Sequence, residues 1–261
     1  MWELYGDFLV QSQKLGINAP QGVVFHKECQ SCDPYRLAEF YTLPVAVLVE
    51  NPHTDGRWLQ LIVNKLRPRL ARYLNGPGKA VDLRHGGGIG SVPAELRRLA
   101  EEYRRYHPGE AVPLRVVVIV DSDRESPDHI SGSANQVMRV ASELGATCHV
   151  LAKRSIENYI PDDALDTFVQ QRADRRYAVE VIKSLSAPAR DFYPMKAGLT
   201  ADLHSRSGSL YPDDIPLGVG LGDFMADFLD NFSHSLSGQG LRERDRVLEF
   251  EELLDKLEKN L

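Results

Sequence analysis

LRVVVIVDSD, at residues 114–123, is the stretch of sequence that best defines the fold. Five consecutive β-branched residues, 116–120, come before the two acids Asp121 and Asp123. A short, continuous apolar run of this kind is typical of a strand that is buried on both faces, as in the interior of a parallel sheet. The sequence therefore predicts a parallel strand with two carboxylates at its carboxyl end.

Similar runs occur before and after this stretch. LPVAVLVE at 43–50 is a second apolar run that ends in an acid, and KAVDLRHGGGIGSV at 79–92 and TCHVLA at 147–152 are further strand candidates. Helical patterns with one apolar face separate these runs, the strongest being AELRRLAEEYRRY at 94–106. Strands that alternate with helices predict an α/β, Rossmann-like, mostly parallel sheet with helices on both faces.

The pattern divides the chain into three parts. Residues 1–42 form an N-terminal extension, residues 43–161 the α/β core, and residues 162–261 a mostly helical C-terminal subdomain. Within the last part, residues 191–220 are rich in Gly, Pro, Ser and Asp, which favours loops. Residues 241–261 predict one charged terminal helix, with an apolar side made of Leu241, Val247, Leu248, Leu254 and Leu257.

Composition and cysteine content limit the class of protein. The chain has 261 residues, of which 43% are hydrophobic and 26% charged, as in ordinary globular proteins. No signal peptide and no apolar run of membrane-spanning length is evident, which favours a cytoplasmic protein. Cys29, Cys32 and Cys148 do not suggest a disulfide framework, and the single C-x-x-C provides too few ligands for an obvious zinc site.

Polar residues gather where the predicted strands end. Ligand sites in open parallel sheets lie at the carboxyl ends of the strands. Acids occur at or just beyond three such ends, and a glycine-rich turn occurs at a fourth. These residues are Glu50, Asp121, Asp123 and Glu157, with Gly86, Gly87 and Gly88 in the turn.

This combination of acids suits a divalent cation. Magnesium prefers oxygen ligands. Asp121 and Asp123 are two residues apart and point to the same side of a straight strand, while Glu50 and Asp55 add two more carboxylates. Two carboxylates about 4 Å apart repel each other by about 4 kcal/mol at an effective dielectric constant of 20, so a cluster favours a bound cation. The alternative is that the aspartates cap a helix and Glu50 pairs with an arginine.

The motifs resemble a known domain. AVLVENPHTDGRWL (46–59), HGGG (85–88), VVVIVDSD (116–123) and AKRSIENYI (152–160) occur in an order similar to that of the Toprim domain. The chain looks most like the version found in OLD-family nucleases and stand-alone antiviral-defence effectors. The resemblance covers roughly residues 43–161.

The resemblance implies a role for each acid. Glu50 is implied as a metal ligand and general base, and Asp121 and Asp123 as paired metal ligands. Asp55 matches the acid that follows soon after the first glutamate, and Glu157 is implied as a ligand for a second ion. Many relatives have glycine after the first glutamate, whereas this chain has Asn51 followed by Pro52, which leaves the role of Asp55 open.

The implied reaction is hydrolysis of phosphodiester bonds with one or two Mg²⁺ or Mn²⁺ ions. Lys153, Arg154 and Lys196 are candidates to neutralise the phosphoryl oxygens. Lys196 lies in YPMKAGL at 193–199, which is similar to a lysine–glycine segment in some relatives. The glycine turn at 86–88 would let the backbone approach a phosphate, although an ordinary turn explains it equally well.

The predicted function is a metal-dependent nuclease that acts on DNA or RNA without a membrane, with a homo-oligomer as an open alternative to a monomer. The resemblance implies a defence effector that acts with an ATPase partner, because relatives often carry or recruit an ATPase and this chain has no G-x-x-x-x-G-K-[ST] motif. The net charge of −6 counts against nucleic-acid binding. The alternative is a non-catalytic Toprim-fold subunit that binds or regulates a nucleic-acid-processing complex, docking through residues 241–261. A topoisomerase or primase would need an additional module, which is not evident.

Overall fold

The structure is a computed structural model. It describes residues 42–75, 80–105, 114–245 and 247–261. The expected N-terminal extension, except for Thr42, and the C-x-x-C motif at Cys29 and Cys32 lie outside the described residues.

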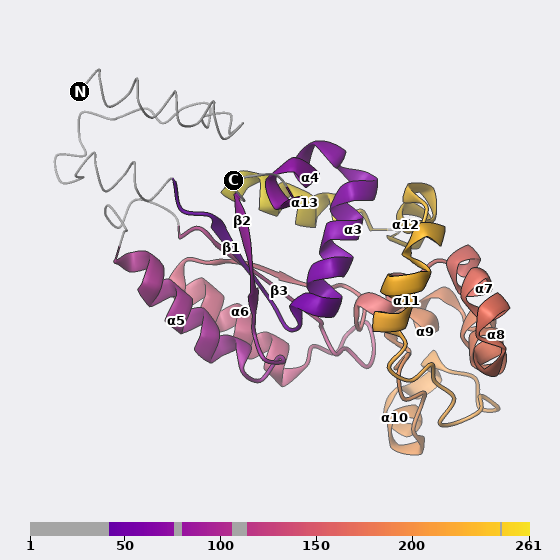
Figure 1. Cartoon of the computed structure of the whole chain (residues 1–261). Coiled ribbons are helices and arrows are strands. Elements are labelled where there is room, and N and C mark those ends of the chain that lie inside the picture. The colour runs from indigo at the N-terminus through magenta and orange to yellow at the C-terminus, as the bar shows by residue number, and fades with distance from the viewer. Residues whose placement is uncertain (1–41, 76–79, 106–113, 246) are drawn as a thin grey trace, which may run out of the picture.

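A parallel sheet forms the centre of the molecule (Figure 1). Its four strands lie in the order β2-β1-β3-β4, and every neighbouring pair is parallel. The strands are β1 (Val45–Val49), β2 (Val81–His85), β3 (Val116–Val120) and β4 (Thr147–Val150). The predicted α/β class with a parallel, Rossmann-like sheet is therefore confirmed.

The two central strands are apolar along their whole length because both faces of the sheet are covered. Alternate residues of β1 and β3 point to opposite faces. Ala46 and Val116 contribute to a core under α5 (Val92–Arg104) and α6 (Gly132–Leu144). Val47 and Val117 contribute to a second core, under α3 (Arg57–Leu66) and α4 (Pro68–Asn75). Pro68 separates α3 from α4, because proline has no backbone N–H to continue the hydrogen bonding of α3.

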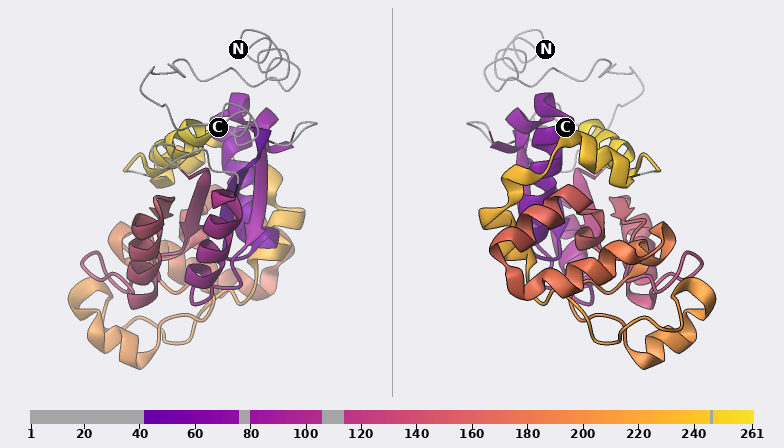
Figure 2. Two further views of the ribbon diagram at one scale, coloured as in Figure 1. Left: turned by 90° about the vertical axis from the view of Figure 1, so that its left-hand side faces the viewer. Right: turned by 90° about the vertical axis from the view of Figure 1, so that its right-hand side faces the viewer.

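The C-terminal part of the chain covers the α3 face of the sheet and continues its core (Figure 2). Phe168, Phe228 and Phe232 pack together there, and they share one hydrophobic cluster with Val45 and Val47 of β1. In the described part of the chain, none of the helices has the length and apolar character needed to cross a membrane. The elements are η2 (Ile156–Tyr159), α7 (Asp162–Gln171), η3 (Ala173–Arg175), α8 (Arg176–Ser184), α9 (Ala187–Phe192), α10 (Ala201–Arg206), η4 (Gly208–Leu210), α11 (Met225–Asn231), η5 (Ser233–Ser235), α12 (Gly238–Asp245) and α13 (Glu249–Asn260).

The prediction of a single terminal helix over 241–261 is wrong, because the chain turns between α12 and α13. The Asp245 carboxylate accepts hydrogen bonds from the amides of Glu249 and Phe250, both at 3.0 Å, and so caps the start of α13. Leu248 adopts a left-handed conformation, with φ of 57°. As a result Val247 and Leu248 are 69% and 68% exposed rather than part of the apolar side.

Candidate functional site

The strand order creates a crevice between β1 and β3. From β1 the chain first adds β2 on one side and then crosses over to add β3 on the other. Such a switch point is where open α/β sheets bind ligands, at the carboxyl ends of the strands. Glu50 directly follows β1, and Asp121 directly follows β3. The backbone amide of Asp121 donates a hydrogen bond to Glu50 Oε1 at 3.2 Å, which holds the two strand ends together.

The turn after Glu50 directs Asp55 back toward the end of β1. The residues Pro52–Gly56 form a π-helical turn, η1. Asn51 starts the turn, since its side chain accepts a hydrogen bond from the amide of His53 at 2.9 Å. The Asp55 carboxylate in turn accepts hydrogen bonds from the Asn51 amide at 2.8 Å and from the Thr54 hydroxyl at 2.9 Å. The Asn-Pro pair thus shapes a turn that keeps Asp55 beside Glu50.

Backbone contacts with the next loop fix the D-x-D motif after β3. Ser122, its middle residue, is fully buried, and its hydroxyl donates to the Lys153 carbonyl at 2.6 Å. The amide of Asp123 donates to the carbonyl of Arg154 at 3.0 Å, and Asp123 has a positive φ of 50°. Asp121 Oδ1 accepts a hydrogen bond from the amide of Ile156 at 3.2 Å. The loop that carries Glu157 therefore packs directly against the two aspartates.

The glycine turn after β2 contains residues with different roles. Gly86 donates a hydrogen bond to the carbonyl of Val49 at 2.7 Å. A side chain there would clash, because its Cβ would lie 2.7 Å from Val92 Cγ2 and 3.0 Å from the Val49 oxygen. Gly87 and Gly88 have φ values of 74° and 87°, which favour glycine. Of the three predicted phosphate-binding glycines, the structure brings Gly88 to the cavity described next.

A cavity of about 450 Å³ lies at the carboxyl ends of β1, β2 and β3. The sequence-predicted residues that line it are Glu50, Asp55, Gly88, Asp121 and Lys196. Side chains that the sequence did not suggest complete the lining, and these are Asn51, Thr54, His85, Asp223, Met225 and Ala226. Three of the predicted acids and the predicted lysine therefore meet at one cavity, although they lie between residues 50 and 196 of the sequence.

The acids of this cavity raise one another's pKa. Burial raises the pKa of Glu50 from 4.5 to about 7, although the hydrogen bond from the Asp121 amide opposes the shift; the charges of Asp55 and Asp123 add to it. Burial also raises the pKa of Asp121 well above its usual range, followed by the charges of Glu157 and Glu50. Among the described residues, neither Glu50 nor Asp121 forms an ion pair with a basic side chain.

Lys196 brings a positive charge to this acidic cavity. Its ammonium lies 3.3 Å from Glu157 Oε1. The charge of Glu157 is the main cause that raises the pKa of Lys196, and Asp121 and Asp223 contribute further. Glu157 itself is buried and does not line the cavity. The structure therefore gives Glu157, predicted as a ligand for a second metal ion, a lysine as its nearest charged partner.

Two glycines hold the backbone of Lys196 in place. The carbonyl of Lys196 accepts a hydrogen bond from the Gly222 amide at 2.9 Å. A Cβ at Gly220 would collide with the Lys196 carbonyl oxygen, and a Cβ at Gly198 would collide with the backbone of Val219. The segment with Lys196 and the loop before α11 can therefore approach this closely only because both positions are glycine.

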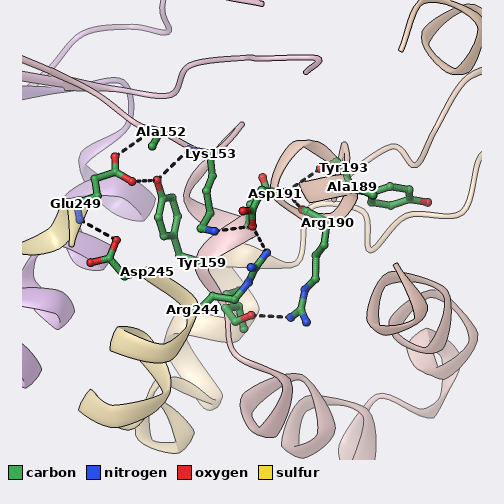
Figure 3. A network of polar contacts seen from close by, with 12 residues as sticks. Ala152, Lys153, Tyr159, Ala189, Arg190, Asp191, Tyr193, Arg244, Asp245 and Glu249 are labelled. Atoms are coloured by element: carbon green, nitrogen blue, oxygen red, sulfur yellow. Dashed lines mark hydrogen bonds and ion pairs between the residues drawn. The ribbon is translucent and has the colours of Figure 1, made fainter. Parts of the chain in front are cut away.

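The other two predicted basic residues lie away from the cavity. Lys153 is 4% exposed, and its Nζ lies 2.5 Å from Asp191 Oδ1, beside Arg244 (Figure 3). Arg154 donates a hydrogen bond from its guanidinium to the carbonyl of Arg124 at 3.0 Å. Lys196 is thus the predicted phosphate-neutralising residue that the structure brings to the acids.

Two cavity carboxylates could hold a magnesium or manganese ion that keeps most of its water. Within the described residues, no three Asp, Glu, His or Cys side chains are arranged so that they could hold a metal ion directly. Magnesium, however, usually binds through one or two carboxylates and keeps several waters. Burial is the main cause that raises the pKa of Glu50 and of Asp121, and repulsion from neighbouring acids adds to it; a bound cation would favour the ionised form of both carboxylates. Glu50 and Asp121 are therefore the residues that would hold such an ion, with Asp55 and Asp123 close enough to attract it.

His85 and Asp223 are the charged or titratable lining residues that the sequence reasoning missed. His85 is the last residue of β2, and the register aligns it with Val49, so its position at a strand end was a usable signal. Asp223 lies before α11, far from the sheet in sequence, and no local pattern indicates its position.

Comparison with protein-family models, with curated proteins and with solved structures gives no match for this chain. The interpretation of the cavity therefore depends on its own geometry and charge.

Proposed function

We propose that this protein is a divalent-metal-dependent nuclease of the Toprim type, which hydrolyses phosphodiester bonds in DNA or RNA. The observation that carries the proposal is the cavity at the switch point of the sheet, where Glu50, Asp55 and Asp121 meet Lys196. Phosphodiester hydrolysis needs a base for water and positive charge near the phosphate, and the cavity contains groups suited to both tasks. The order of the acids along the sequence supports the Toprim assignment.

Glu50 is suited to be the general base. Without metal its pKa is raised to about 7, and a cation bound beside it would lower that pKa, so the carboxylate would be ionised and able to accept a proton at neutral pH. In this mechanism Glu50 accepts a proton from the attacking water, and the Lys196 ammonium stabilises the negative charge on the phosphoryl oxygens. A bound divalent cation would lower the pKa of water and neutralise developing charge. Gly88 lets the substrate approach the cavity wall without obstruction by a side chain.

Cleavage assays test the proposal. Plasmid DNA and transfer RNA are incubated with the native chain in Mg²⁺, Mn²⁺ or EDTA, beside the Glu50→Gln variant. Loss of a general base reduces the rate by about 10²–10⁴-fold, so we expect cleavage that requires metal and largely disappears in Glu50→Gln. Glu143→Gln, on the exposed surface of α6, is the matched control and should cleave normally. Cleavage that persists in EDTA and in Glu50→Gln refutes the proposal.

The partner also remains a proposal. An effector that works with an ATPase subunit is supported by the resemblance to a family whose members often carry or recruit an ATPase, since this sequence has no phosphate-binding loop motif of its own. Co-purification with the product of a neighbouring ATPase gene tests this idea. The competing interpretation, a non-catalytic subunit that docks through residues 241–261, gains little support, because α13 packs against the protein's own sheet through Phe250, Leu254 and Leu257.

A further inference from the structure

One surface outside the cavity combines an exposed aromatic ring with arginines. It consists of Arg175, Arg176 and Tyr177, where η3 joins α8, and we call it the Arg–Tyr surface. Tyr177 is 60% exposed, and it is the only aromatic among the exposed large hydrophobic side chains of the described residues. The next residues, Ala178 and Val179, are buried. The ring therefore projects from a helix that is itself firmly packed.

The Arg–Tyr surface adjoins the wall of the cavity. The guanidinium of Arg175 lies against Gly222, since a Cβ at Gly222 would be 3.5 Å from both of its terminal nitrogens. Gly222 comes directly before Asp223, which lines the cavity. The amide of Gly222 also donates to the carbonyl of Lys196. Arg175 is thus one residue away from the cavity lining.

The same loop is held to the body of the protein by Tyr193. The hydroxyl of Tyr193 donates to the carbonyl of Val219 at 2.5 Å. The loop from Val219 to Asp223 therefore connects Arg175 to the cavity, and Tyr177 follows Arg175 by two residues along the chain.

The chemistry of this surface suits one kind of ligand. Exposed aromatic rings stack on unpaired bases, at about 1–3 kcal/mol per base, and arginines pair with phosphates. A duplex keeps its base faces stacked inside, so a ring that projects from a protein surface favours a single strand. Asp174 pairs with both Arg172 and Arg175, whereas Arg176 has no ion pair among the described residues, which leaves it as the arginine available to a phosphate.

We propose that the Arg–Tyr surface binds a single-stranded stretch of the substrate, with a base stacked on Tyr177 and a flanking phosphate paired with Arg176. This inference rests on the proposed nuclease function, because the strand would pass from this surface over the loop before α11 into the cavity. It names single-stranded nucleic acid, or an unpaired loop, as the substrate class.

Fluorescence anisotropy measures the binding separately from cleavage. A fluorescein-labelled thymidine oligonucleotide is titrated with the Glu50→Gln chain, with and without Tyr177→Ala. The stacking energy predicts that Tyr177→Ala weakens binding by about tenfold or more, whereas Tyr177→Phe keeps the ring and the affinity. Arg176→Ala should weaken binding and reduce the salt dependence by about one phosphate contact. Arg139→Ala, on α6 at the other face of the sheet, is the matched control and should bind normally.

The inference is overturned if the Glu50→Gln chain binds the oligonucleotide with the same affinity with and without Tyr177→Ala. A parallel cleavage assay uses chains that keep the native Glu50, and it distinguishes failure of the Arg–Tyr surface from failure of the proposed nuclease function. If Tyr177→Ala shows metal-dependent cleavage with an unchanged KM, the nuclease function is supported and the role of the Arg–Tyr surface is refuted. Binding that depends on Tyr177 without any cleavage leaves the surface and counts against the nuclease.

Discussion

Replacing Glu50 by glutamine should stabilise the metal-free protein at alkaline pH while it removes activity. The Glu50 carboxylate is held near Asp55, Asp121 and Asp123, and burial with this repulsion raises its pKa from 4.5 to about 7. The native chain must therefore ionise Glu50 in an unfavourable place above neutral pH. Glutamine keeps the shape and can still accept the hydrogen bond from the Asp121 amide, but it has no charge.

The size and sign of the effect follow from the two pKa values. Between pH 4.5 and about 7 the folded chain keeps the Glu50 proton, whereas the unfolded chain has released it. The free energy of unfolding of the native chain therefore falls as the pH rises through this window, by at most about 3 kcal/mol. Because Glu50 is only partly buried, solvent screening reduces the expected value to about 2 kcal/mol. The Glu50→Gln chain lacks this loss.

Urea unfolding in EDTA measures the difference. At about pH 8 Glu50→Gln should exceed the native chain by about 2 kcal/mol, and at about pH 5 the advantage should nearly disappear. Saturating Mg²⁺ should stabilise the native chain more than the variant, because the ion binds the folded carboxylates. A variant that is less stable than the native chain at alkaline pH, or an advantage that does not change with pH, would refute the reasoning.

Three further perturbations test other parts of the account. Lys196→Met should reduce kcat by about 10²-fold or more, because it removes the positive charge next to Glu157 that stabilises the transition state. Steady-state kinetics measure this loss, and an unchanged kcat would contradict the role of Lys196. Gly220→Ala should destabilise the fold by about 1–3 kcal/mol through its clash with the Lys196 carbonyl, whereas Gly90→Ala, with open space around it, should not; equal melting temperatures would contradict this. Glu249→Ala should lower the free energy of unfolding by about 3 kcal/mol or more, because it leaves the buried donors of Ala152 and Tyr159 without their acceptor in the network of Figure 3. Urea unfolding measures this loss, and an unchanged free energy would exclude a stabilising role for the network.

The central strands could be predicted because their environment leaves a local mark on the sequence. Residues on both faces of β1 and β3 are buried, which requires apolar side chains at every position. The break in the terminal helix could not be predicted in the same way. It depends on Asp245 capping α13 and on a left-handed Leu248, and a helical pattern of apolar residues continues across it.

The acids of the site were predictable because each follows a strand, and the ends of parallel strands meet at one edge. Basic residues were harder to assign. Lys153 follows β4 and therefore looked accessible, but Asp191 and Arg244, both distant in sequence, enclose its side chain. The approach of Lys196 and Asp223 to the cavity depends on close packing between two loops, which no local periodicity records.

A crystal soaked in Mn²⁺ tests the central claim most directly, because anomalous scattering locates the ion independently of any assay. The account predicts a manganese ion at the cavity, bound by carboxylate oxygens of Glu50 and Asp121, and no such ion in Glu50→Gln crystals. A cavity that takes up no manganese, with Glu50 paired to a basic side chain instead, would contradict the claim.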